Sequence, residues 1–532
     1  MTMRWILLFV AVLPVPGKCQ LEDRPIAEWN KAAVPVRNLS PSWRQEVEHR
    51  RWDRPWLERA NAVVHYEQLL PVFERLNEGK PLVVLGLGSS IVATHGGCFN
   101  NRSQLYRHVS HVREHLNAEI CEPHGWMGSF MGELNRSWPH ADHIYINLGQ
   151  PGGDIAQYAR HWCFAGTLPK EVDLVVIEDH GGSKWWGEKG AHVEQIFVQL
   201  AHKGREGRAP AFVFVTTMFV VDIWHEEWKT PVPSERFEEC LKSRCSNASL
   251  CADYATSLLT KKTGSTFGSA GEDSFSAVMH WYGFSVLSIR NAFVSALRDR
   301  AWGMSDCVLS WLFYQDSIHP SPAGVLFYAD VLLNHFHAGL AWYKQVVAGN
   351  ASNHARAVPQ ASVNDEAWDI PLRRCFSVET SAGLPVDASR THGWAWAEER
   401  RPGHVTKPGW LTTQAGAVLT MKLSTLIHPR GAALAATLTL TYLASYDAMG
   451  MATLRCEGLC RCLPMQINAH HASHASVEAY AAINVTQTRE CELTLSNDSP
   501  AGLKWKLLGL SVEARTDPRY PRQNQSLRTA YF

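Results

Sequence analysis

The stretch Leu82–Val92 reads LVVLGLGSSIV, an apolar run that ends in glycines and serines. Three later apolar runs are each separated from the next by helix-like sequence: His143–Ile146, Leu174–Ile177 and Ala211–Val215. Continuous apolar strands that alternate with helices are typical of a parallel sheet covered on both faces. We therefore predict a three-layer α/β fold, with a further strand at Phe284–Ser288.

The segments between these runs are predicted to be helical. They are Gln104–Leu116, Asp154–Phe164 and His192–His202, and a closing helix is predicted over Pro322–Tyr343. The stretch 20–75 is rich in Trp, Arg and Glu, and we expect it to form a helical arm after an extended start. The α/β domain itself is predicted to span residues 76–345.

A second domain is predicted beyond residue 370. Residues 346–370 have the Ala, Asn, Ser and Pro composition of a linker. After them, partly alternating runs indicate strands at Ala417–Leu423, Ala436–Tyr442 and Glu492–Leu495. Such runs favour a smaller all-β sandwich over residues 371–515, followed by a polar tail at 516–532.

Composition and the first residues indicate the class of protein. The chain has 532 residues, 45% hydrophobic, and a formal net charge of zero. It has no long Lys/Arg run, so we expect no nucleic-acid partner. Arg4 precedes the apolar run Trp5–Pro16, which is short for a membrane span. Residues 1–19 are therefore predicted to be a cleaved signal peptide, leaving a mature chain without a membrane span.

Cysteines and glycosylation sequons agree with a secretory route. Of the 13 cysteines, Cys19 lies in the predicted signal region, which leaves an even number suited to disulfides. Asn-x-Ser/Thr sequons occur at Asn38, Asn101, Asn135, Asn247, Asn350, Asn484, Asn497 and Asn524. At Asn38 and Asn497 a proline follows the serine, so these are weaker acceptors. We expect a secreted, lumenal or cell-surface glycoprotein with N-linked glycans.

Two segments carry residues suited to nucleophilic catalysis. Gly88-Ser89-Ser90 follows the first strand, at the sheet edge where α/β proteins place their functional crevice. Taken alone, these serines are helix caps. Asp316-Ser317-Ile318-His319-Pro320 places a carboxylate three residues before a histidine, where it can fix the tautomer and leave Nε2 to face a nucleophile. We therefore predict a Ser90–His319–Asp316 triad.

The order Gly88-Ser89-Ser90-Ile91, Gly152, Asp316-x-x-His319-Pro320 resembles the SGNH (GDSL-like) hydrolase and esterase superfamily. The resemblance covers about Pro81 to Tyr343. It implies a flavodoxin-like sheet, with Ser90 as nucleophile and with Ser90 and Gly152 as backbone oxyanion donors. Ser89 stands where the family often has Asp, which makes Ser89 the weaker nucleophile candidate. The run Tyr442–Gly450, followed by Cys456 and Cys460, resembles C-terminal domains of two-domain algal SGNH-type proteins.

One position departs from that family. Its oxyanion asparagine is expected shortly after the third strand, but Gly182 stands there. Loss of a side-chain donor costs about 3 kcal/mol of transition-state stabilisation. His180, Ser183 or a backbone N–H at Gly181 or Gly182 is the candidate substitute.

Other chemistries fit the sequence less well. An α/β-hydrolase elbow needs a final glycine where Val92 stands. Zinc bound by Cys456, Cys460 and Cys462, with the histidines nearby (His470, His471 and His474), is less favoured than disulfides, so neither metal nor cofactor is expected. The turn at His140–His143 is expected to be solvated.

The function predicted from these residues is removal of O-acyl groups from a glycan. Trp185 and Trp186 follow the third strand and suit stacking on sugar rings, with buried packing as the alternative. An O-acyltransferase with the same triad and a glycan-binding protein with a degenerate site remain open.

Overall fold

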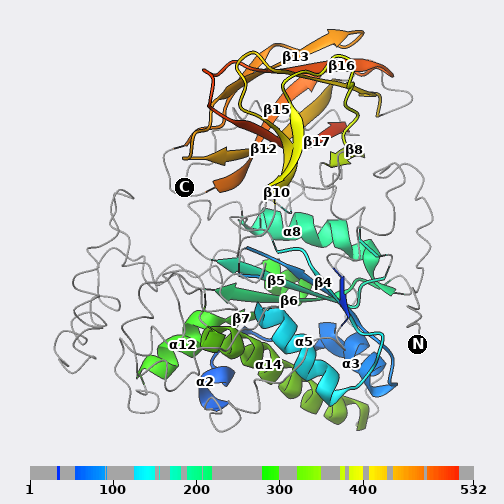
Figure 1. Ribbon diagram of the computed structural model, residues 1–532. Helices are drawn as coiled ribbons and strands as arrows, with labels where there is room; N and C mark the ends of the chain where they lie inside the picture. The colour runs from blue at the N-terminus through cyan, green and yellow to red at the C-terminus, as the bar shows by residue number, and fades with distance from the viewer. Residues whose placement is uncertain are drawn as a thin grey trace, which may run out of the picture.

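A computed structural model describes two groups of secondary-structure elements (Figure 1). The described residues are 33–35, 54–89, 91–92, 125–149, 155, 158, 168–169, 171–180, 189–205, 208–217, 278–298, 320, 322–348, 372–377, 383–399, 407–427, 435–471 and 476–514. The first group is an α/β sheet with its helices, and the second consists of antiparallel β-strands.

Within the described residues, one seven-stranded sheet has the order β1-β4-β3-β5-β6-β7-β2. Neighbours among β4, β3, β5, β6 and β7 run parallel. The edge strands β1 and β2 run antiparallel to their neighbours. The strands are Ala33–Pro35 (β1), Asn61–Val63 (β2), Val83–Leu87 (β3), Ile144–Asn147 (β4), Leu174–His180 (β5), Ala211–Thr217 (β6) and Ser285–Ser288 (β7).

The parallel core confirms the predicted α/β class. Counted along the chain, its five described strands follow the order 2-1-3-4-5, which is the flavodoxin-like order. The predicted parallel sheet is confirmed for this core, whereas both described edge strands are antiparallel. Strands β1 and β2 lie in the stretch 20–75 predicted as a helical arm, which also contains helix α2 (Arg54–Glu58) and most of α3 (Leu70–Asn77). Three-residue strands are too short to produce a periodic signal.

Each central strand buries side chains on both faces of the sheet. Val84, Val176 and Val213 point to one face and Leu85, Val175 and Phe212 to the other, as the two-residue period of a strand requires. Helices α5 (Gly125–Ser137), α12 (Ile289–Arg298) and α14 (Pro322–Ala348) cover the first face, and α8 (Lys189–Leu200) covers the second (Figure 1). The sheet therefore packs against one apolar core on each face.

Predicted helices are confirmed where residues are described. The closing helix is α14, and the segment predicted at His192–His202 is α8 followed by the 3-10 turn η5 (Ala201–Lys203). A second 3-10 turn, η3 (Tyr66–Leu69), precedes α3. Residues 104–116 lie outside the described part. None of the described helices combines the length and apolarity needed to cross a bilayer.

His143 was expected on a solvated turn, and this expectation was wrong. Its side chain is 1% exposed. Nδ1 accepts the Leu82 N–H at 3.0 Å, and Nε2–H donates to the Trp138 carbonyl at 2.8 Å. Because Nδ1 accepts a hydrogen bond, the ring is neutral, and burial, which lowers the pKa of His143, favours the same form. The ring connects the start of β3 to the end of α5.

The C-terminal strands form a β-sandwich. One described sheet has the order β15-β12-β17-β10-β9 with β8 beside β17, and the other has the order β11-β16-β13-β14. All described neighbours are antiparallel. The strands are Leu372–Ser377 (β8), Ala395–Glu399 (β9), Lys407–Thr412 (β10), Val418–Leu423 (β11), Ala436–Ser445 (β12), Met451–Gly458 (β13), Met465–Asn468 (β14), Ser476–Val485 (β15), Cys491–Asn497 (β16) and Trp505–Ala514 (β17).

The inward side chains of both sheets share one core. Leu493 and Leu495 alternate with outward Thr494 along β16, which confirms the alternation predicted there. Trp505 stacks on Tyr442 with ring centroids 5.2 Å apart. The sequon residue Asn497 is fully buried, and its Nδ2 donates to the Gln414 carbonyl. A glycan on that nitrogen has no room in this fold.

Candidate active site at the carboxyl ends of the strands

Strands β3 and β5 are adjacent at the point where the strand order reverses, so their carboxyl ends border the crevice that such sheets use for ligands. Leu87 pairs with Ile177; Gly88 and Ser89 follow Leu87, and Glu178 and Asp179 follow Ile177. On the far side of β5, Glu178 pairs with Val215 and His180 with Thr217 of β6. Polar groups from three neighbouring strands therefore gather at this edge.

Gly88 directly follows β3 in a conformation and a space that only glycine fits. Its φ is +157°, and a Cβ there would lie 2.6 Å from Glu178 Oε2 and 2.7 Å from Val92 Cγ2. A side chain would have to displace the carboxylate or the buried valine. The glycine therefore lets the backbone of β3 approach Glu178 closely before Ser89.

Ser89 is fixed by Glu178 of the neighbouring strand. Both the Ser89 N–H and the Ser89 hydroxyl donate to Glu178 Oε2, at 2.8 and 2.7 Å. Thr217 Oγ1 donates to Glu178 Oε1 at 2.7 Å. Ser89 is 2% exposed and Glu178 1% exposed, so this group is sealed from solvent.

The charge state of Glu178 is governed by opposing effects. Burial is the largest effect and raises the pKa of its carboxyl, and the nearby Asp179 raises it further. The hydrogen bonds from Thr217 and Ser89 act in the opposite direction, because they stabilise the carboxylate. The net pKa lies above the ordinary value for a glutamate.

Tyr158 holds the same turn from the other side. Its hydroxyl accepts the Gly88 N–H at 3.1 Å and lies 2.6 Å from the Gly88 carbonyl and 2.5 Å from the Leu148 carbonyl. Asn147 Nδ2 donates to the Val92 carbonyl at 2.8 Å. These bonds tie the turn after β3 to the end of β4.

Most of the predicted site residues lie outside the described part of the chain. These are Ser90, Gly152, Gly182, Trp185, Trp186, Asp316 and His319. His180 is the last residue of β5, and only its backbone belongs to the described part. The neighbours of Ser90, namely Ser89 and Ile91, are described and buried, as is Pro320 beside His319. The predicted triad therefore stays a prediction.

Ser89 is unsuited to the role of nucleophile. Its hydroxyl proton is donated to a buried carboxylate, and its oxygen accepts the Ile91 N–H at 3.2 Å. An attacking hydroxyl must instead be open to a substrate carbonyl. The ranking of Ser90 above Ser89 stays a prediction, because Ser90 lies outside the described residues.

Glu178, Thr217 and Tyr158 were not predicted from the sequence to contact the Gly88–Ser89 turn or its partner. One signal was present: Glu178 and Asp179 interrupt the apolar strand LVVIEDH, where buried charges need partners. Thr217 and Tyr158 carried no comparable signal, because a hydroxyl at a strand end or in a helix is common.

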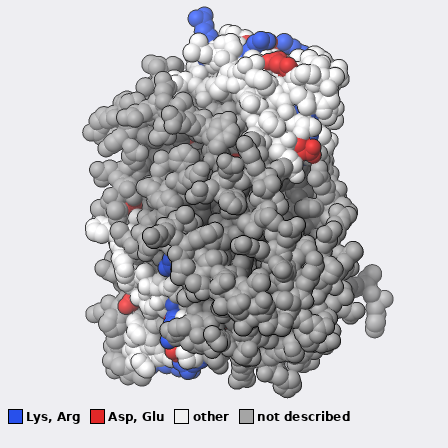
Figure 2. Space-filling view, turned by 90° about the vertical axis from the view of Figure 1, so that its left-hand side faces the viewer, with Lys and Arg blue, Asp and Glu red and all other residues white. Residues whose placement is uncertain are grey.

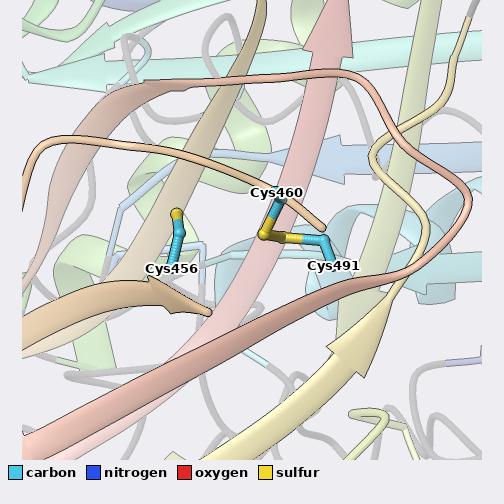
Figure 3. A group of neighbouring side chains, drawn as sticks. All are labelled: Cys456, Cys460 and Cys491. Atoms are coloured by element: carbon cyan, nitrogen blue, oxygen red, sulfur yellow. A yellow bond between two sulfur atoms is a disulfide. The ribbon is translucent and has the colours of Figure 1, made fainter. Parts of the chain in front are cut away.

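The cysteine cluster of the sandwich consists of disulfides. Cys460 bonds to Cys491, as Figure 3 shows, and Cys456 bonds to Cys462. Sulfur atoms of Cys456, Cys460 and Cys491 lie within 4.8 Å of one another, but each is already in a disulfide. The expectation of disulfides over zinc at these cysteines is therefore confirmed, since metal binding needs thiolates.

Acidic and basic side chains are interspersed on the face in Figure 2, wherever that face is described. In the sandwich, Arg390 pairs with Glu457 and Glu492, and Lys422 lies 2.7 Å from Asp387. The Arg390–Glu457 pair is exposed on both sides, and such a pair contributes little to stability. These pairs give this part of the surface a mixed charge.

Comparisons with known proteins bear on the whole fold. No family model and no curated protein matches the chain. A solved two-domain esterase (CEX) active on acetylated mannans, co-crystallised with mannopentaose, is similar with a TM-score of 0.51 over 87% of this chain and 98% of that chain. The chain shares the fold of this two-domain esterase. A second structure of the CEX esterase gives a TM-score of 0.50 over 86% and 98% of the two chains, and identity is 14% in both comparisons.

Proposed function

We propose that the chain is a secreted SGNH-type serine ester hydrolase that removes O-acyl groups from a glycan. The observation that carries this proposal is the sealed Gly88–Ser89 turn at the carboxyl end of β3, beside the reversal of strand order. This turn leads directly into Ser90. The likeness in fold to an esterase that acts on acetylated mannans supports the same conclusion.

In the first step, Ser90 Oγ attacks the ester carbonyl carbon and His319 Nε2 takes the serine proton. Asp316 accepts the Nδ1–H of His319 and stabilises the imidazolium that forms. The tetrahedral intermediate then collapses: its bond to the alcohol oxygen breaks, and His319 returns the proton to the leaving sugar hydroxyl. An acyl-enzyme on Ser90 remains.

In the second step, a water molecule attacks the carbonyl carbon of the acyl-enzyme, and His319 takes a proton from this water. The bond between Ser90 Oγ and the acyl carbon breaks, the serine recovers its proton, and the carboxylic acid leaves. The developing oxyanion is held by the N–H groups of Ser90 and Gly152, with Gly182 or His180 in the place of the family's asparagine.

The substrate class follows from three independent considerations. The related fold belongs to an esterase active on acetylated mannans. The disulfides of the sandwich fit an oxidising compartment, where extracellular glycans occur. Trp185 and Trp186 follow β5 in the sequence and offer indole faces to sugar rings. An O-acetylated polysaccharide satisfies all three.

The test uses the full mature chain and its Ser90→Ala and Ser89→Ala variants. We expect the wild type to release acetate from acetylated mannan and to react with a fluorophosphonate probe. Ser90→Ala should lose both activities, whereas Ser89→Ala should still be labelled because Ser90 is intact. Labelling that survives Ser90→Ala would refute the assignment of the nucleophile.

The same assay separates the rival functions. An acyltransferase would move the acetyl group to an added sugar acceptor in preference to water, which mass spectrometry of the products detects. A glycan-binding protein would bind mannan without labelling or turnover. Either result would overturn the hydrolase proposal.

A further inference from the structure

The catalytic serine of the proposed function is flanked by two residues that share one hydrogen-bond chain. Glu178 Oε2 accepts from the hydroxyl of Ser89, and Ser89 Oγ accepts the Ile91 N–H. Ser89 and Ile91 are the residues before and after Ser90. These hydrogen bonds therefore connect a carboxylate on β5 to both sequence neighbours of the nucleophile.

Glu178 has both carboxylate oxygens occupied in this arrangement. Oε2 receives two bonds from Ser89, and Oε1 receives one from Thr217 of β6. The Thr217 bond fixes the rotation of the carboxylate, so Oε2 can only present itself to the turn. The bond from the Ser89 N–H fixes the backbone of Ser89. A shift of this backbone would also shift Ser90, the next residue.

The space around the turn leaves few alternatives to this contact. Gly88 brings the backbone so close that a Cβ there would lie 2.6 Å from Glu178 Oε2. Ser89, Ile91 and Val92 are all buried, so water is kept from the Ser89 donors. When the acceptor of such a buried donor is removed, no water can take its place, and the donor is left without a hydrogen bond.

We propose that Glu178 is a positioning residue that orients Ser90 by fixing the Ser89 backbone and hydroxyl from the neighbouring strand. The inference rests on the proposed function for its effect on turnover, and on the hydrogen bonds alone for its effect on the turn. Glu178 acts through Ser89 and is assigned no contact with substrate.

Three variants separate positioning from general support of the fold. Glu178→Ala removes every bond to Ser89. Glu178→Gln keeps an acceptor for Ser89, while its amide can donate to Thr217 Oγ1. Asp173→Asn is the matched control: Asp173 is a buried carboxylate that accepts the Val83 N–H at 2.7 Å, but at the opposite end of β3.

The first readout is amide hydrogen exchange in the native protein. We expect Glu178→Ala to speed exchange at the Ser89 and Ile91 amides by at least about tenfold relative to amides of β6, because both bonds depend on the carboxylate. Glu178→Gln should restore protection. Asp173→Asn should leave these two amides unchanged relative to β6. Unchanged exchange in Glu178→Ala would overturn the proposal.

The second readout is ester hydrolysis. We expect Glu178→Ala to lower kcat about 100-fold with little change in KM, since a small misplacement of a reacting group costs about that much. Glu178→Gln should recover most of kcat, and Asp173→Asn should keep it. Loss of kcat in Asp173→Asn equal to that in Glu178→Ala would reduce Glu178 to a structural role.

The two readouts keep the two proposals apart. If the wild type is inactive, or if Ser90→Ala keeps full activity, the proposed function fails while hydrogen exchange still decides the role of Glu178. If Glu178→Ala does not fold, Ser89→Ala replaces it. That variant should speed exchange at Ile91, because it removes only the hydroxyl, and unchanged exchange there would refute the chain of bonds.

Discussion

His335 Nδ1 lies 2.9 Å from Asn61 Oδ1, although 274 residues separate the two in the chain. Asn61 begins the edge strand β2 and His335 lies in α14, so this bond fastens one sheet edge to the helical layer. His335 is fully buried, and burial lowers its pKa to about 3. The neutral ring therefore donates Nδ1–H to the amide oxygen.

The first prediction is a loss of stability in acid. Unfolded His335 takes up a proton near its ordinary pKa of 6.5, whereas the folded protein does so only near 3. Above pH 6.5 both states are neutral and this group has no effect. Below pH 6.5, each pH unit lowers the free energy of unfolding by up to about 1.4 kcal/mol, until the pH reaches the pKa of His335 in the folded protein. Urea unfolding across this range measures the slope.

His335→Gln tests that slope, because a neutral side chain cannot bind the proton. We expect a flatter pH profile in this variant. His143→Gln serves as a comparison, since burial lowers the pKa of His143 too. If the stability of His335→Gln falls with pH as steeply as that of the wild type, other groups cause the loss of stability in acid.

The second prediction concerns the glycine at the end of β3. Gly88→Ala should lower the free energy of unfolding by about 1–3 kcal/mol and reduce ester hydrolysis, because the new Cβ collides with Glu178 and Val92. Gly79→Ala is the control. Gly79 also has positive φ, +66°, but a Cβ added there would have nothing within 4 Å. This variant should lose stability by backbone strain alone and keep its kcat.

The third prediction compares two buried tyrosines. Tyr158→Phe removes the hydroxyl shared by Gly88 and Leu148 and should cost about 1–3 kcal/mol, with reduced turnover. Tyr145→Phe should cost almost nothing, since no described group bonds the buried Tyr145 hydroxyl. Thermal unfolding and ester hydrolysis measure both effects. Equal losses in the two variants would contradict the bridging role of Tyr158.

The fourth prediction ranks the two disulfides of the sandwich. The bond between Cys460 and Cys491 closes 31 residues of chain, and that between Cys456 and Cys462 closes 6. Loop-closure entropy gives about 4 kcal/mol for the longer loop and about 2 kcal/mol for the shorter. We expect the Cys460→Ala/Cys491→Ala pair to be the less stable in urea. The reverse order would show that loop length does not set the ranking.

The parallel core could be predicted from the sequence because each strand is buried on both faces. Ala211–Thr217 carries apolar residues at successive positions, and the same is true of the start of β5. Helix α5 was missed because Gly125, Gly128 and Gly132 weaken its helical signal. Helix α12 was overlooked although Ile289, Ala292 and Phe293 have helical spacing.

The polar network beneath the candidate site could not be predicted from the sequence. Ser89 and Glu178 are 89 positions apart, and only the pairing of β3 with β5 brings them together. Glu178 could be recognised as unusual but not assigned a partner. His143 was misjudged for the same reason, because its partner Leu82 lies 61 positions earlier.

The two edge strands have a consequence for biosynthesis. Both β1 and β2 precede every strand of the parallel core in the chain, yet β2 pairs with β7, the last strand of the sheet. A ribosome must therefore translate past Ser288 before β2 can find its neighbour. The nascent chain carries an unpaired strand throughout that interval, and such long-range closure makes folding of the sheet slow.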